Sequence, residues 1–123
     1  MKDNSIGDSE FKLMELIWDR APISSGELSD ICAELHGWKK TTVYTMIKRL
    51  SDKGFVASNK AKITYLVRRE EVQHQQSNEV VEKNFKGSLP SFVSAFLGSG
   101  GKKSLSKDDA AKLIEMIENH TED

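Results

Sequence analysis

Apolar residues recur near helical intervals in residues 8–20, and this spacing predicts a first helix. Asp8 or Ser9 can cap its first N–H groups. Pro22 ends it, because proline lacks the N–H group that would continue the hydrogen-bond ladder. The apolar positions of this helix are Phe11, Met14, Leu16, Ile17 and Trp18.

A second, shorter helix is predicted between Ser24 and Gly37. Ser24 and Glu27 stand three residues apart, as in a capping box. Gly37 can end the helix in the left-handed conformation, which glycine adopts without steric cost, and Trp38 then begins the next element as a core anchor. The apolar stripe of this helix is Leu28, Ile31, Cys32 and Leu35, so Cys32 is predicted to be a small core residue.

A third helix is predicted from Lys40 or Thr41 to Asp52, with Gly54 closing it. Its buried stripe falls at positions i, i+3, i+4 and i+7, namely Val43, Met46, Ile47 and Leu50. The opposite face carries side chains that can donate or accept hydrogen bonds and extend outward from the helix. They are Thr41, Tyr44, Thr45 and Lys48, flanked by Thr42 and Arg49.

After Gly54 the pattern changes to extended chain. Residues 55–57 and 63–67 predict two strands, and residues 58–62 predict a polar tip between them. Three helices followed by a basic-tipped hairpin predict a helix-turn-helix with a wing. In that fold the third helix enters the major groove of DNA and the hairpin contacts the backbone beside it.

The rest of the chain predicts three further helices. The first runs from about Glu70 to Phe85, the second includes Pro90, and Ser106 with Asp109 three residues later begins the last; residues 98–104 have the composition of a flexible linker. These helices are too short to form a core alone, so we expect their apolar faces to be buried in a homodimer. The residues expected there are Val80, Val81, Phe85, Leu89, Phe92, Val93, Phe96, Leu97, Leu113, Ile114 and Ile117.

This pattern predicts a mainly α fold with a small β-hairpin wing. Residues 1–70 would form a winged helix-turn-helix DNA-binding domain, and residues 71–123 an α-helical dimerisation domain. The composition, with 37% hydrophobic and 30% charged residues, is that of a globular protein. No apolar run approaches the roughly 18 residues of a membrane span. We expect a cytoplasmic protein without a secretory signal, in which the single cysteine cannot form an intramolecular disulfide.

Charge is strongly segregated along the chain, although the net charge is only −1. Residues 1–38 carry three Lys/Arg against eight Asp/Glu, residues 39–69 carry nine against one, and residues 70–123 carry six against ten. A local excess of eight positive charges is the electrostatic footprint of a phosphate-binding surface, although a solvated basic face would look the same.

No pattern in the sequence indicates catalysis or a bound metal. His36, His74 and His120 have no cysteine or carboxylate partners at ligand spacing. Residues 98–101 are glycine-rich but lack the preceding strand of a phosphate-binding loop, and no Lys-Ser/Thr pair follows Gly101 directly. We therefore expect a protein that is not an enzyme and needs no cofactor.

Residues 38–55, WKKTTVYTMIKRLSDKGF, resemble the recognition-helix signature of the penicillinase and methicillin-resistance repressor family (BlaI/MecI/CopY). The first helix, EFKLMELIW at 10–18, is similar to the opening motif of that family. So are KGSL at 86–89, SFV at 91–93 and LSKDD at 105–109. The resemblance extends in consistent order from about Asp8 to His120.

The resemblance implies a homodimeric repressor of transcription that binds inverted repeats of the TACA/TGTA type. It also implies relief of repression when a membrane sensor peptidase leads to cleavage in the fifth helix. Three departures bear on this. Lys40-Thr41-Thr42 replaces the common Pro-Lys-Thr, Tyr44 replaces a commonly basic residue, and Ala95-Phe96 replaces the Asn-Phe cleavage pair. No cysteine follows Cys32, so the paired-cysteine tail of the copper-responsive relatives is missing.

The predicted partner is therefore double-stranded operator DNA. Tyr44 can stack on a sugar or donate to phosphate, and Lys48 and Arg49 are predicted phosphate contacts. Thr42 and Thr45 can bind phosphate oxygens, meet a thymine methyl group or simply be helix surface. Lys60 and Lys62 suit the DNA backbone but also an exposed turn. The full predicted set is Lys39, Lys40, Thr41, Thr42, Tyr44, Thr45, Lys48, Arg49, Lys60 and Lys62.

A different class of function stays open at this stage. Winged-helix folds also serve as protein-interaction modules, and the acidic flanks of this chain would suit one. An interaction module has no reason to gather nine basic residues on the third helix and hairpin, so the charge pattern favours DNA.

Overall fold

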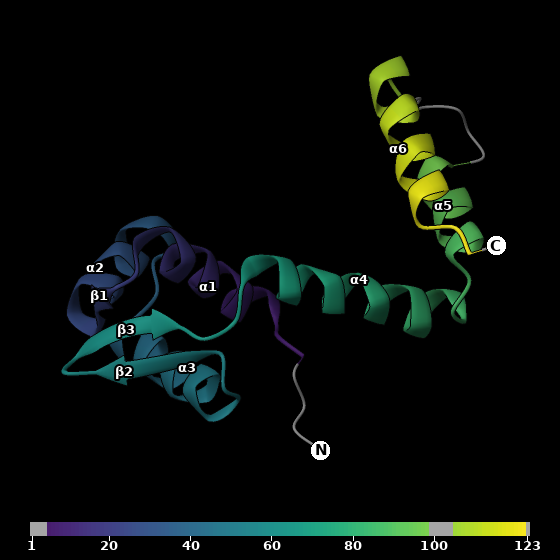
Figure 1. The fold of residues 1–123 in the computed structure, drawn as a ribbon. Coiled ribbons are helices and arrows are strands. Elements are labelled where there is room, and N and C mark those ends of the chain that lie inside the picture. The colour runs from purple at the N-terminus through teal and green to yellow at the C-terminus, as the bar shows by residue number, and fades with distance from the viewer. Residues whose placement is uncertain (1–4, 99–104, 123) are drawn as a thin grey trace. The chain divides into compact units, whose positions relative to one another are not determined.

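The computed structural model describes residues 5–98 and 105–122, which form two compact units (Figure 1). The first unit ends at Asn78 and the second begins at Glu79, within the fourth helix. The elements are α1 (Asp8–Arg20), β1 (Ile23–Ser24), α2 (Ser25–His36), α3 (Lys40–Asp52), β2 (Val56–Asn59), β3 (Lys62–Tyr65), α4 (Arg69–Phe85), α5 (Leu89–Leu97) and α6 (Lys107–Asn119). The mainly α fold with a small β wing is confirmed. The boundary after residue 70 between two independent domains stays a prediction.

One hydrophobic core holds the first unit together. It joins α1, α2 and α3 to the small sheet and to the start of α4, where Val72 is buried. The predicted stripes of α1 and α3 are confirmed in outline, but Ile47 is only partly buried. In α2 the prediction is right for Leu28 and Cys32 and wrong for Leu35, which lies in the last turn of the helix and is 59% exposed. The fully buried members include Leu13, Met14, Ile17, Leu28, Cys32, Val43, Leu50, Val56 and Ile63. Burial raises the pKa of the Cys32 thiol, which disfavours the reactive thiolate and agrees with a core role.

The helix starts are set by local hydrogen bonds. The hydroxyl oxygen of Ser24 accepts from the N–H of Glu27 at 3.1 Å, as the sequence predicts for α2. The predicted cap of α1 is wrong, because the cap residue is Gly7 and not Asp8 or Ser9. Asp8 and Ser9 already lie in the first helical turn. The Glu10 carboxylate instead reaches back and accepts from the N–H of Gly7 at 3.1 Å.

The end of α3 is a Schellman motif, which fixes where the wing begins. The N–H of Phe55 donates to the carbonyl of Leu50 at 2.8 Å, and the N–H of Gly54 donates to Ser51 at 3.0 Å. Gly54 has φ +84°, which a residue with a side chain rarely adopts. The side chains of Phe55 and Leu50 are both buried, so this helix end is part of the core.

The wing is part of a three-stranded antiparallel sheet with the order β1-β3-β2. Strand β1, which pairs Ile23 with Ile63, was not predicted from the sequence. The predicted five-residue tip is too long: Ser58, Asn59 and Lys62 are paired within the strands. The turn consists of Lys60 and Ala61, whose φ angles are +52° and +63°. Two residues of positive φ form the type of turn that matches the twist of a tight hairpin.

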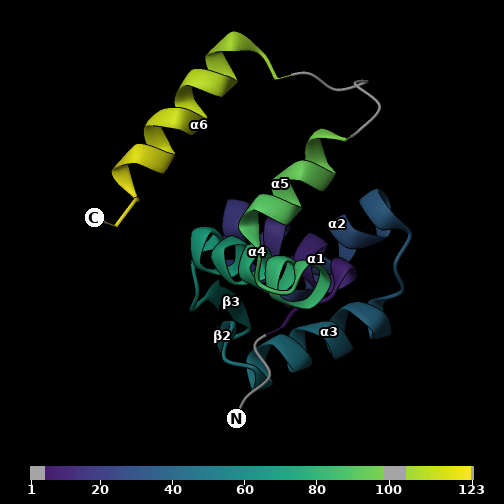
Figure 2. The same ribbon diagram turned by 90° about the vertical axis from the view of Figure 1, so that its right-hand side faces the viewer.

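The second unit comprises the end of α4 with α5 and α6 (Figure 2). The hydroxyl of Ser88 caps α5 by accepting from Ser91, and the hydroxyl of Ser106 caps α6 by accepting from Asp109 as predicted. Neither α5 nor α6 contains a buried residue. Apart from Gly98, the predicted linker lies outside the described residues.

Candidate nucleic-acid interface

All ten side chains predicted to contact DNA are exposed, and eight of them lie on α3 or at the residue before it. Lys60 lies in the turn of the wing, and Lys62 is the first residue of β3. A single helix face and the neighbouring hairpin therefore present the whole predicted set to solvent. Whether these residues bind DNA stays a prediction.

One flank of α3 faces the wing across a groove of about 340 Å³. Tyr44 and Lys48 line it from α3, and Ser25 lines it from the start of α2. The wing contributes Ser58 and Ile63, so α2, α3 and the wing all line the groove. Ser25, Ser51 and Ser58 line this groove but are not among the residues predicted to contact DNA. Ser51 had a signal, because it lies three residues after Lys48 and seven after Tyr44 on the same helical face.

The other flank of α3 carries Thr42, Thr45 and Arg49 beside a shallow hollow of about 230 Å³. The hydroxyl of Thr45 donates to the carbonyl of Thr41 at 2.9 Å within the helix. That hydroxyl has no second hydrogen to donate, so Thr45 can offer only acceptor oxygen and its methyl group. Thr42 is thus the better candidate of the two for donating a hydrogen bond.

The side chains of Lys40 and Tyr44 are neighbours on the first turns of α3. The ammonium nitrogen of Lys40 lies 5.6 Å from the centre of the Tyr44 ring, a cation–π distance. Tyr44 itself is 39% exposed. The ring is therefore held at the surface beside a cation and not packed into the core.

The nine basic residues of segment 39–69 fall into two groups. Lys53 pairs with Glu10, and Arg69 pairs with Glu15 at 2.9 Å and with Asp19 at 3.0 Å. Within the described residues the other seven form no ion pair. Their positive charge is not neutralised locally, which is the condition for attracting phosphate.

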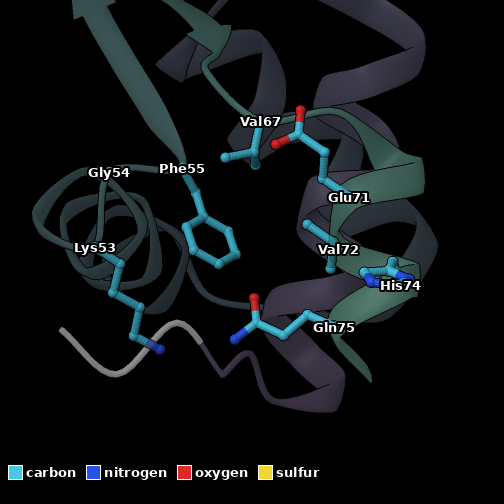
Figure 3. A pocket seen from close by; sticks show the side chains of 8 residues that line it. All are labelled: Lys53, Gly54, Phe55, Val67, Glu71, Val72, His74 and Gln75. Atoms are coloured by element: carbon cyan, nitrogen blue, oxygen red, sulfur yellow. The ribbon is translucent and has the colours of Figure 1, made fainter. Parts of the chain in front are cut away.

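A separate cavity of about 480 Å³ lies between the start of β2 and α4 (Figure 3). Figure 3 shows the ring of Phe55 and the side chains of Val67 and Val72 around it, with the carboxamide of Gln75 turned toward the ring. None of the ten predicted DNA contacts lines it. The part of the chain that the structure describes holds no cluster of histidine, cysteine and carboxylate side chains suited to a metal.

Most of the residues predicted for a dimer interface are exposed in the single chain. Seven of the eleven are exposed, with Phe96 at 61%, and the other four are half-buried. Phe92 makes ring contacts with Phe85, at 5.3 Å between centroids, and with Phe96, at 6.4 Å. The exposed members are Val80, Leu89, Val93, Phe96, Leu113, Ile114 and Ile117.

A helix-turn-helix that is followed by a wing of two paired strands and has an exposed, basic third helix defines a winged-helix protein. The penicillinase repressor family matches residues 6–119, and the chain belongs to this family of transcriptional repressors. No helix within the described ranges has both the length and the apolar character needed to cross a membrane.

Characterised relatives cover nearly the whole chain. The methicillin resistance regulatory protein MecI of Mammaliicoccus sciuri is 27% identical over 120 residues, which is 94% of this chain and 95% of the relative. The protein of the same name from Staphylococcus aureus strain N315 has the same identity and coverage. The penicillinase repressor of Bacillus licheniformis is 24% identical over 119 residues, covering 94% of this chain and 91% of the relative. These relatives are regulators, which supports a role other than catalysis.

Proposed function

We propose that this protein represses transcription by binding operator DNA as a homodimer. In this proposal α3 enters the major groove, and the tip of the wing, with Lys60 in the turn and Lys62 at the start of β3, follows the backbone. The observation that carries it is the set of exposed cations on α3 and the wing that lack an ion pair with any described residue. A location in the cytoplasm, where promoters are accessible, follows from the same proposal.

The homodimer is proposed from the uncovered apolar face of α4, α5 and α6. Phe96 and Ile117 are about 60% exposed in the single chain. Burial of such an apolar side chain contributes roughly 1.5–3 kcal/mol of stabilising free energy, so an interface that covers this face would be favourable. A second copy offers the same face in return, as a twofold interface requires. Two linked α3 helices would then read the two halves of an inverted repeat of the TACA/TGTA type.

The test is the salt dependence of binding to a duplex that carries such a repeat. The logarithm of the affinity should fall by about 0.9 per phosphate contact for each tenfold rise in salt. Lys48→Ala should weaken binding to all sequences and lower this slope. Lys112→Ala is the matched control, because Lys112 is also exposed but lies on α6. A flat salt response of the wild type would contradict the proposal.

The alternative is a winged-helix module that binds another protein without reading DNA. Its acidic candidates are on α2, where Glu27, Asp30 and Glu34 are exposed. The basic face of α3 favours DNA over this alternative. Two results together would support the module instead. One is DNA binding that is tight but does not depend on the operator sequence, and the other is loss of repression when the charges of these α2 carboxylates are reversed.

A further inference from the structure

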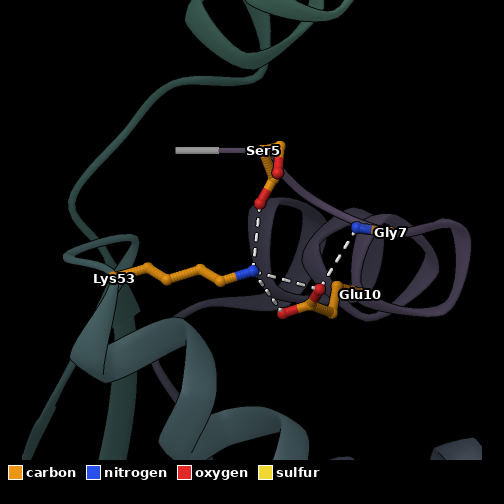
Figure 4. A network of polar contacts seen from close by, with 4 residues as sticks. All are labelled: Ser5, Gly7, Glu10 and Lys53. Atoms are coloured by element: carbon orange, nitrogen blue, oxygen red, sulfur yellow. Dashed lines mark hydrogen bonds and ion pairs between the residues drawn. The ribbon is translucent and has the colours of Figure 1, made fainter. Parts of the chain in front are cut away.

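Lys53 belongs to the basic segment of the chain, but its side chain is turned toward α1 (Figure 4). Its ammonium nitrogen donates to the carbonyl of Ser5 at 3.0 Å and lies 3.2 and 3.3 Å from the two carboxylate oxygens of Glu10. The same carboxylate accepts from the N–H of Gly7. One lysine therefore binds both the segment that leads into α1 and the first turn of α1.

The contact joins elements that are far apart in the sequence. Lys53 is the residue that caps the C-terminal end of α3, directly before the Schellman glycine Gly54. Glu10 lies 43 residues earlier. The side chains of Lys53 and Glu10 are only 26% and 13% exposed, so water screens this pair less than a pair on the open surface.

We propose that Lys53 is a positioning residue for the DNA-reading helix and not a phosphate contact. Its ammonium fixes the C-terminal end of α3, and with it the start of the wing, against α1. DNA readout needs the exposed side chains of α3 to be held within a fraction of an ångström by residues that do not themselves touch DNA. This inference rests on the proposed function.

A phosphate contact by Lys53 would require both of its contacts to α1 and Ser5 to break. The carboxylate of Glu10 would then stay mostly buried without its cation, which is unfavourable. Seven other basic residues of the segment have no ion pair with any residue that the structure describes, and so none of these to give up. The structure thus divides the basic residues into those that can meet phosphate and those that hold α1 in place.

A double-mutant cycle on the full chain tests this inference. The four proteins are the wild type, Lys53→Met, Glu10→Gln and the double variant, each titrated with a duplex carrying an inverted TACA/TGTA repeat at several salt concentrations. Glutamine at position 10 retains an oxygen for the N–H of Gly7. Lys48→Met serves as the matched control, because its side chain is exposed on α3.

Lys53→Met should weaken operator binding about two- to tenfold and leave the salt slope unchanged. In the Glu10→Gln background the same change should have a much smaller effect, because the two residues act as one unit. Lys53→Arg should retain most of the affinity, since a guanidinium can also donate to Glu10 and Ser5. Lys48→Met should lower the salt slope equally in both backgrounds.

Two results would overturn the positioning role while leaving the proposed function intact. One is a salt slope that falls by about 0.9 for each Lys53 side chain removed, as for a phosphate ligand, together with losses of operator affinity that add to those of Glu10→Gln. The other is unchanged affinity in Lys53→Met. Absence of operator binding by the wild type at every salt concentration would overturn the proposed function and this role together. Urea unfolding of each variant would confirm that the titrated proteins are folded.

Discussion

The indole N–H of Trp18 donates a 2.9 Å hydrogen bond to the carbonyl oxygen of Val67, so the end of α1 is tied to the chain that leaves the wing. The ring of Trp18 also makes an edge contact with Phe11, at 5.7 Å between centroids, and lies 5.2 Å beneath the guanidinium of Arg69. Trp18, one of the apolar positions that predicted the first helix, is thus also a hydrogen-bond donor that links distant elements.

Trp18→Phe should destabilise the protein by about 1–3 kcal/mol, because it removes the donor and leaves the Val67 carbonyl without this partner. The free energy of unfolding from urea titration measures the effect. Tyr65→Phe is the control: Tyr65 is exposed, and its change should stay within about 0.5 kcal/mol. Equal stability of the Trp18→Phe protein and the wild type would contradict a structural role for the bond.

Ala61→Gly should stabilise the wing. Ala61 has φ +63°, a conformation that costs an alanine roughly 1 kcal/mol and glycine much less. The gain should be close to this value, reduced by the greater freedom of glycine in the unfolded chain. Ala57→Gly, at a paired position in β2, should destabilise instead. Thermal unfolding of the two variants should therefore shift in opposite directions.

Thr42→Ala and Tyr44→Phe should change the preference among operators more than the affinity for any one of them, if these side chains reach base edges. Each lost base contact is worth about 1–3 kcal/mol of discrimination. Competition between single-base variants of the operator measures this preference. Losses of equal size on every sequence would reassign the two residues to phosphate.

Phe96→Asp should shift the protein from dimer to monomer in sedimentation at micromolar concentration, because it places a charge in the proposed apolar interface. Operator affinity should fall with it, since linked half-sites make the second contact intramolecular. Ser94→Asp is the matched control, on the same helix and also exposed. A wild type that sediments as a monomer would refute the interface.

The wild-type chain should resist cleavage between Ala95 and Phe96 by a sensor-linked peptidase that reads an Asn-Phe pair. The site lacks the asparagine amide that such a peptidase would bind. Ala95→Asn should create a cleavage site, whereas Ser94→Asn should not, because its asparagine does not precede a phenylalanine. Sequencing of fragments decides this, and a clean break in the wild type at Ala95-Phe96 would contradict the prediction.

The helices were predictable because their signals are local. The spacing of Val43, Met46 and Leu50 defines the inner face of α3 and, by difference, its exposed face. Ser24, Gly37 and Gly54 set helix ends through hydrogen bonds that span only a few residues. The α3 part of the candidate DNA surface follows from the same periodicity, and Lys60 and Lys62 follow from the polar tip between the two strands; all ten residues are exposed as expected.

Contacts between distant residues were not predictable. The two-residue strand β1 has no pattern of its own and exists because Ile23 pairs with Ile63. The turn at Lys60 and Ala61 lacks the glycine or asparagine that usually indicates a tight hairpin, so the sequence predicts a tip that is too long. The pairing of Lys53 with Glu10 depends on how α1 packs near the end of α3, which no local signal gives.

The pairing of β1 with β3 also bears on how the protein folds. The three helices and the β2-β3 hairpin form through contacts between near neighbours, which are fast to make. The Ile23–Ile63 pair closes a loop of about forty residues and has to wait for them, because long loops cost more entropy to close. We expect β1 to pair with β3 after the folding transition state, so the edge of the sheet that β1 forms is completed last.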